Sequence, residues 1–134
     1  MIVRHPHAHE VGAILALFAQ DVAAGLMLPR SASQIRHHLD RWLVAEQDGQ
    51  VIGCVSLVCY NGSLAEVRSL AVCPDHRNNG IGSQLVPAAV AMARARGLKL
   101  VLALTSAGGL FERLGFERQA VTNFPGKGWC YSTA

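Results

Sequence analysis

Charged and aromatic residues are scarce in this sequence, and that scarcity excludes several classes of protein. Charged residues make up 16% and aromatic residues 6% of the 134 residues, whereas hydrophobic residues make up 51%. The formal net charge of +3 is spread along the chain without a basic block, which argues against a nucleic-acid surface. The uninterrupted apolar runs are too short to cross a bilayer. We therefore expect residues 1–134 to form a single globular domain that binds neither nucleic acid nor a membrane.

Cysteine is also used sparingly, and without the Cys-x-x-Cys spacing of redox and zinc sites. The four cysteines are Cys54, Cys59, Cys73 and Cys130. Because no stretch resembles a cleavable signal peptide, we expect reduced thiols in a cytoplasmic protein. His5, His7 and His9 alternate as in some metal sites. Clustered histidines are more often solvated than ligating, so we expect no metal.

A glycine-containing turn carries the strongest functional signal. It reads Arg77-Asn78-Asn79-Gly80-Ile81-Gly82 and lies between the apolar run Val67–Val72 and the helical pattern Ser83–Arg96. Glycine lets successive backbone N–H groups converge on an anion at the positive end of a helix, and Arg77 adds a fixed charge. The fingerprints Gly-x-Gly-x-x-Gly and Gly-x-x-x-x-Gly-Lys-Ser/Thr are absent, which disfavours dinucleotides and nucleoside triphosphates. The turn predicts a phosphate site, with an ordinary strand-to-helix turn as the competing interpretation.

Apolar spacing predicts helices and strands that alternate along the chain. We expect a short strand at Ile2–Arg4, a helix at His9–Ala24 and a helix over Ser83–Arg96 that Pro87 makes irregular. A second helix, capped by Ser31, has an apolar stripe formed by Ile35, Leu39, Trp42 and Leu43. The turns Asp48-Gly49 and Asn61-Gly62 separate three strands of an antiparallel meander: Leu43–Glu46, Val51–Cys59 and Leu64–Val72.

The last part of the chain predicts one more strand and one more helix. Leu98–Leu104 is apolar at nearly every position, which is typical of a strand buried on both faces. Thr105 or Ser106 is expected to cap the helix that contains Leu110–Leu114. Phe116 then begins a final short strand.

Three segments together resemble the GNAT superfamily of acyl-CoA-dependent N-acyltransferases. They are Glu66–Val72, Arg77-x-x-Gly80-x-Gly82 and Leu110–Phe116, and their order and spacing agree with the family over essentially the whole chain. Further segments look most like the acetyltransferase domain of N-acetylglutamate synthases and their short stand-alone relatives: Leu28–Ser31, Leu64–Val72, Leu104-Thr105 and Phe124–Lys127. The resemblance implies an α+β fold with a central, mixed but mostly antiparallel sheet, about four flanking helices and a strand splay at the acyl-CoA cleft.

The resemblance also implies acetyl-CoA as co-substrate and assigns residues to it. Backbone amides of the turn would bind the pyrophosphate: Asn78, Asn79, Gly80, Ile81, Gly82 and Ser83, beside Arg77. Backbone groups of Leu70, Ala71 and Val72 would pair with the pantetheine arm and polarise the thioester carbonyl. No nucleophilic side chain is needed, because the acceptor amine attacks directly once it is deprotonated.

Glu66 is the candidate base, and the identity of the acid stays open. Without the resemblance, we would interpret Glu66 as a residue that only pairs with Arg68 on a solvated edge. With the resemblance, we interpret Glu66 as the base. Many relatives place a tyrosine where this chain has Phe111. The leaving thiolate would therefore take its proton from water or from Thr105 or Ser106, or leave unprotonated. Cys73 has no adjacent histidine and is interpreted as structural.

Arg30, Arg68 and Ser69 are the candidate acceptor-binding residues. A guanidinium grips a carboxylate with two parallel hydrogen bonds, so the two arginines favour a carboxylated amino acid, glutamate first. Arg30 as an ordinary surface residue remains the competing interpretation. An acetyltransferase of another small amine, or of a protein N-terminus or lysine, and a non-catalytic acyl-CoA-binding module remain alternatives.

The end of the chain is short for this family. Pro125, Gly126 and Gly128 interrupt any final strand, whereas relatives finish with two strands. A partner chain would supply the missing strand, so we expect a homodimer.

Overall fold

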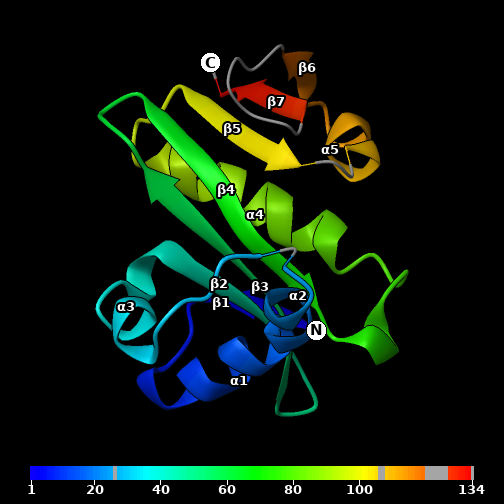
Figure 1. The fold of residues 1–134 in the computed structure, drawn as a ribbon. Helices are drawn as coiled ribbons and strands as arrows, with labels where there is room; N and C mark the ends of the chain where they lie inside the picture. The colour runs from blue at the N-terminus through cyan, green and yellow to red at the C-terminus, as the bar shows by residue number, and fades with distance from the viewer. Residues whose placement is uncertain (26, 106–107, 120–126, 134) are drawn as a thin grey trace.

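The computed structural model describes residues 1–25, 27–105, 108–119 and 127–133. Figure 1 shows the elements in chain order. They are β1 (Ile2–Arg4), η1 (Ala8–Glu10), α1 (Val11–Leu17), α2 (Ala19–Ala23), α3 (Ala32–Arg36), η2 (Leu39–Arg41), β2 (Trp42–Gln47), β3 (Gln50–Cys59), β4 (Leu64–Val72), η3 (Pro74–His76), α4 (Gly82–Ala95), β5 (Leu100–Thr105), α5 (Gly109–Arg113), β6 (Glu117–Gln119) and β7 (Lys127–Ser132).

The seven strands form one mixed sheet in the order β1-β2-β3-β4-β5-β7-β6. Every neighbouring pair is antiparallel except β4 and β5, which are parallel and are joined through α4, as a parallel pair requires a crossover. The predicted antiparallel meander is β2, β3 and β4. The α+β class and the mostly antiparallel sheet are confirmed.

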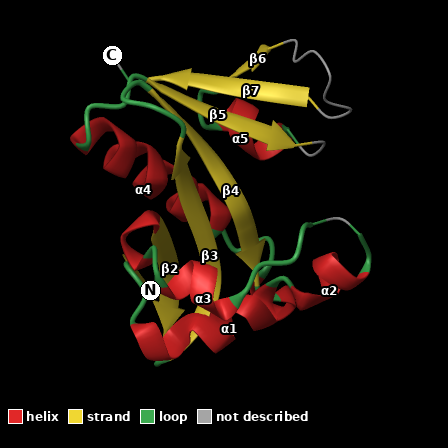
Figure 2. Cartoon of the chain, turned by 60° about the vertical axis from the view of Figure 1, so that its left-hand side comes forward, coloured by secondary structure: helices red, strands yellow, loops and turns green. Residues whose placement is uncertain are grey.

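Helices cover the two faces of the sheet separately. Buried residues of α4 pack with one face of β2 to β5 in the larger apolar cluster. Helices α1 and α3 pack against the opposite face of β2, β3 and β4, through a second cluster that contains Phe18 and Trp42. Figure 2 shows α4 and the α1–α3 group on opposite sides of these strands.

Strand β4 contains the irregularity that shapes the centre of the molecule. Its register with β3 shifts by one residue between the pairs Cys54↔Ala71 and Ser56↔Arg68, and Ser69 lies there with φ of 55°. The pairing with β5 runs only from Leu64 to Val67. Beyond Val67 the two strands diverge, as Figure 1 shows. The predicted splay is therefore present, next to a β-bulge.

Two of the predicted helices differ from the structure. The helix expected at His9–Ala24 is divided at Phe18, whose φ is −114° and ψ is 15°. The second helix ends at Arg36, and Trp42 already belongs to β2. Trp42 and Leu43 belong to clusters on opposite faces of the sheet, which is the alternation of a strand and not the stripe of a helix. Helix α4 is uninterrupted from Gly82 to Ala95 despite Pro87.

The C-terminal part corrects three further expectations. In β5, Val101 and Ala103 are buried but Leu100 is 42% exposed, so only the face towards α4 is fully covered. Helix α5 begins after Gly108 without a side-chain cap; Ser106 lies outside the described residues. Both final strands are present, and β7 lies between β5 and β6 with Gly128 inside it. The argument for a homodimer from a missing strand is therefore wrong.

Candidate active site

A pocket of about 670 Å³ lies where the end of β4 meets the start of α4. Its lining includes nine of the ten residues assigned to the acyl-CoA, all but Asn79. Asp21, His76, Leu110 and Arg113 complete it, from elements that sequence analysis did not connect to the turn. The residues of the turn and of β4 thus share one cavity that opens beside the diverging strands.

The turn has the backbone shape of an anion-binding loop. Gly80 has φ of 78° and Asn78 has φ of 66°, so two residues of the turn adopt the left-handed conformation. Gly82 is instead the first residue of α4, where a Cβ would lie 3.2 Å from Leu110 Cδ2. Helix α4 has 14 residues and no side-chain N-cap, which leaves its positive end to an external anion. Arg77 Nε donates to the Val72 carbonyl at 3.3 Å and fixes the guanidinium near the turn.

Glu66 lies one residue before the strands diverge and is held by two donors. The residue is 4% exposed, and its Oε1 atom is 2.9 Å from Arg68 Nε. The Tyr60 hydroxyl donates to the same oxygen, while Arg68 Nη2 donates to the Tyr60 hydroxyl at 2.6 Å. Burial and the hydrogen bond to Glu66 raise the pKa of Tyr60, so that it stays a donor at neutral pH. The hydrogen bond to Glu66 raises the pKa of Arg68.

Tyr60 is a residue that sequence analysis missed. In the β3–β4 hairpin, however, Val58 pairs with Glu66 and the Tyr60 amide donates to the Leu64 carbonyl. Side chains two residues apart on one strand share a face, which brings Tyr60 beside Glu66. The register of the Asn61-Gly62 hairpin was the signal that could have found it.

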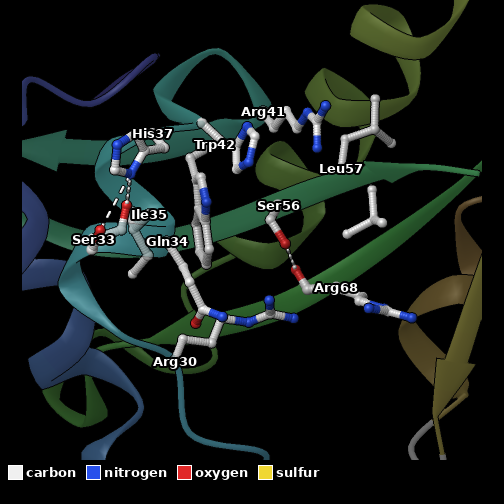
Figure 3. A pocket seen from close by; sticks show the side chains of 12 residues that line it. Arg30, Ser33, Gln34, Ile35, His37, Arg41, Trp42, Ser56, Leu57 and Arg68 are labelled. Atoms are coloured by element: carbon white, nitrogen blue, oxygen red, sulfur yellow. Dashed lines mark hydrogen bonds between the residues drawn. The ribbon is translucent and has the colours of Figure 1, made fainter.

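A second pocket, of about 400 Å³, lies between α3 and the face of β3 and β4 that carries Arg68 (Figure 3). Its basic lining residues are Arg30, His37, His38, Arg41 and Arg68, and no Asp or Glu occurs among its described lining residues. Arg30 Nε donates to Ser69 Oγ at 3.1 Å, so the three predicted acceptor residues meet. Burial lowers the pKa of Arg30, and the positive charge of Arg68 adds to this effect. Two cations that line one pocket favour an anion between them.

Thr105, Phe111 and Cys73 are the other residues that sequence analysis considered for the chemistry. Thr105 is the last residue of β5 and is partly buried. Phe111 is 6% exposed and packs edge-on against Phe116 at 5.2 Å between ring centroids, in place of the tyrosine of many relatives. Cys73 donates its amide to the Ile52 carbonyl at 2.8 Å.

The histidines near the start of the chain make local contacts. His5 Nδ1 is 2.8 Å from the Trp42 carbonyl oxygen, and the rings of His7 and His9 stack. Within the described ranges, no group of three or more His, Cys, Asp or Glu side chains could hold a metal ion. In that same part of the chain, no helix is long and apolar enough to cross a membrane.

Comparison with known proteins connects this geometry to one family. The sequence pattern of the acetyltransferase (GNAT) domain matches residues 38–118. An uncharacterized N-acetyltransferase of Chlorobaculum tepidum is 39% identical over 127 residues, which are 95% of this chain and 82% of that protein. The amino-acid acetyltransferase of Aeromonas salmonicida is 30% identical over 118 residues, which are 87% of this chain and 27% of that protein. The chain thus spans less than a third of the length of that longer relative.

Solved structures share the fold at lower sequence identity. A Mycobacterium tuberculosis protein crystallised in complex with CoA superposes with a TM-score of 0.91 at 23% identity, with 100% of both chains covered. N-acetylglutamate synthase from Neisseria gonorrhoeae, complexed with coenzyme A and N-acetyl-glutamate, gives a TM-score of 0.88 at 23% identity. That match covers 99% of this chain and 35% of the synthase. At these identities the superpositions establish the shared fold.

Proposed function

Since this chain belongs to the GNAT acetyltransferases and is an acetyl-CoA-dependent N-acetyltransferase, we propose that it acetylates the amine of a small carboxylated amino acid, with glutamate favoured. The observation that supports this acceptor most is the second pocket. Arg30 and Arg68 line it together, beside the buried carboxylate of Glu66. The amino-acid acetyltransferase named among the relatives agrees with such an acceptor.

In this proposal the first pocket holds acetyl-CoA. The backbone amides from Asn78 to Ser83 face its pyrophosphate, and Arg77 contributes a fixed positive charge. The backbone of Leu70, Ala71 and Val72, which β5 does not pair with, bonds to the pantetheine arm and polarises the thioester carbonyl. The diverging strands then direct the acetyl group towards Val67, one residue from Glu66.

Glu66 removes a proton from the acceptor ammonium group, directly or through a water molecule. The free amine attacks the acetyl carbon, a C–N bond forms, and the C–S bond breaks with its electron pair on sulfur. Burial of Glu66 keeps the carboxylate away from bulk water. The thiolate takes a proton from water or from the hydroxyl of Thr105 or Ser106, because Phe111 has no proton to give.

The acceptor carboxylates are bound by Arg30 and Arg68, with Ser69 holding Arg30 in place. A lysine or a protein N-terminus is disfavoured, because the described lining of the second pocket contains five basic side chains and no carboxylate. A non-catalytic acyl-CoA binder would have no need of a buried carboxylate beside the splay.

Cytoplasmic location and a homodimer complete the proposal. The low fraction of charged residues, 16%, supports an interface between copies. Size-exclusion chromatography at several protein concentrations tests it, since a dimer elutes earlier as the concentration rises.

An acceptor panel tests the proposed function. Free-thiol release from acetyl-CoA is followed with glutamate, other amino acids and cationic amines; glutamate is expected to give the highest kcat/KM. If glutamate gave no thiol release and a cationic amine did, the assignment of Arg30 would be overturned. Glu66→Gln is expected to lower kcat at least 100-fold with little change in acetyl-CoA affinity, and equal activity would remove Glu66 as the base.

A further inference from the structure

Arg68 lies between the candidate base and the acceptor pocket and contacts both. Its Nε atom is 2.9 Å from Glu66 Oε1, and its side chain also lines the second pocket. The Arg68 side chain is 37% exposed, whereas that of Glu66 is 5% exposed. The guanidinium therefore has room to move towards the pocket, and the carboxylate does not.

Two features make that movement favourable when an anion enters. Arg30 and Arg68 line the same pocket; burial lowers the pKa of Arg30, and the repulsion from the Arg68 charge adds to this effect. A carboxylate placed between them relieves this repulsion and offers both guanidinium groups a charge-assisted hydrogen bond. An acceptor without a carboxylate offers Arg68 neither advantage.

We propose that a carboxylated acceptor draws Arg68 away from Glu66 and thereby releases the base that deprotonates its own amine, while Tyr60 keeps Glu66 in place. This inference rests on the proposed function, because it assumes Glu66 as base and the second pocket as acceptor site. Arg68 is then a specificity-determining residue, and Tyr60 a positioning residue.

The reason is the number of hydrogen bonds that Glu66 accepts. Glu66 Oε1 accepts hydrogen bonds from both Arg68 Nε and the Tyr60 hydroxyl, so the acceptor ammonium group cannot donate to that oxygen while both are bound. When Arg68 leaves, Glu66 retains the hydrogen bond from Tyr60, whose ring also lies 5.7 Å from Arg68 Cζ. The phenol is protonated at neutral pH, and burial raises its pKa further. Glu66 keeps its orientation, and the position that Arg68 occupied at Oε1 becomes open to the acceptor ammonium group.

Arg68→Gln separates this coupling from simple acceptor binding. Kinetics are measured with glutamate and with its diamide, which lacks both carboxylates but keeps the amine and the carbon chain. We expect Arg68→Gln to raise KM for glutamate at least tenfold and to raise kcat for the diamide at least threefold over the wild type. Arg118→Gln, an exposed arginine on β6, is the matched control and should change neither.

A fall or no change in kcat for the diamide would overturn the inference, because Arg68 would then only bind. Coenzyme A affinity, measured by calorimetry, reports folding of the variant; Arg68→Met, with a stem of similar length, replaces it if Arg68→Gln does not fold. The proposed function fails separately, if the wild type does not acetylate glutamate or if Glu66→Gln is fully active.

Tyr60→Phe tests the positioning role. We expect kcat for glutamate to fall about tenfold with KM within twofold of the wild type, and Tyr131→Phe, on β7, to have no effect. An unchanged kcat, or a rise in KM alone, would show that Tyr60 does not position Glu66.

Discussion

The left-handed glycine of the turn offers a test of the phosphate site that uses backbone conformation alone. Gly80 has φ of 78°, and nothing lies within 4 Å of a Cβ built on it. Gly97, at the end of α4, has φ of 79° and the same open surroundings. Replacing either by alanine therefore adds no clash, and the strain of the left-handed conformation is the only penalty, about 1–2 kcal/mol.

The two variants should show this penalty in different measurements. The backbone of Gly97 is held by hydrogen bonds from its own amide to the Arg94 carbonyl and from the Leu98 amide to the Ala93 carbonyl, both 3.0 Å. Gly97→Ala is therefore expected to lower the melting temperature by roughly 3–8 °C and to leave coenzyme A affinity unchanged. The Gly80 turn is exposed, so in Gly80→Ala we expect the free protein to relax out of the left-handed conformation, which binding must then restore.

Gly80→Ala is accordingly expected to weaken coenzyme A binding about 5- to 30-fold, with a smaller change in melting temperature than Gly97→Ala. Isothermal titration calorimetry with coenzyme A measures the affinity, and calorimetric melting of the apo protein measures the stability. Wild-type affinity in Gly80→Ala would refute the reasoning, because the turn would then not shape the anion site. An equal loss of affinity in Gly97→Ala would refute it as well.

Three further predictions concern stability and reactivity. The bidentate contact with the Arg4 guanidinium lowers the pKa of Glu10 from 4.5 to about 2, so this contact stabilises the fold above pH 4.5 and the contribution is lost as the pH falls towards 2. Glu10→Gln should lower the free energy of unfolding, measured with urea, by about 1–2 kcal/mol at pH 7 and by much less near pH 2. An equal loss at both pH values would contradict this. Burial raises the pKa of Cys54 to about 12, so the thiol should resist Ellman's reagent at pH 8 until the protein unfolds; rapid labelling of the native protein at Cys54 would show that the strand is open. In Gly108→Ala a Cβ would lie 2.2 Å from Trp129 Cζ2, and the displaced ring should lower the unfolding free energy by about 1–3 kcal/mol, whereas an unchanged melting temperature would mean that the ring moves freely.

The elements that could be predicted from sequence are those defined by local signals. The Asp-Gly pair at residues 48–49 and the Asn-Gly pair at residues 61–62 separate the three strands of the meander. Strand β4 has the predicted bounds Leu64–Val72. Gly97 ends α4 in the left-handed conformation that glycine favours. Each of these signals lies within a few residues of the boundary that it marks.

The helix predicted from the apolar residues between Ile35 and Leu43 was wrong in its extent, because their spacing is compatible with two structures. Helical spacing places Ile35, Leu39 and Trp42 on one face, and the structure does bury Ile35 and Trp42 in one cluster. Yet Leu43 lies on the other face of the sheet, under α4. Tertiary packing on two sides overrode the helical period, and the sequence alone contains no signal for that.

The lining of the first pocket could be predicted from the sequence for the most part and that of the second pocket only in small part, for the same physical reason. The turn is contiguous in sequence, so one motif names nearly all of its residues. The second pocket joins a loop, α3, η2, β2, β3 and β4, and of its lining residues only Arg30 and Arg68 were anticipated, with Ser69 bonded to Arg30. His37, His38 and Arg41 enter it because α3 ends early and the chain turns back into β2.

The path of the acetyl carbon tests the central claim most directly. The wild-type protein is incubated with acetyl-CoA carrying ¹³C in the acetyl carbonyl and with glutamate, and the label is followed by NMR while free thiol is counted. The account predicts that the label moves to an amide on the glutamate nitrogen, with one thiol released per amide formed. Label that stays in the thioester, or that appears only as free acetate, would contradict it.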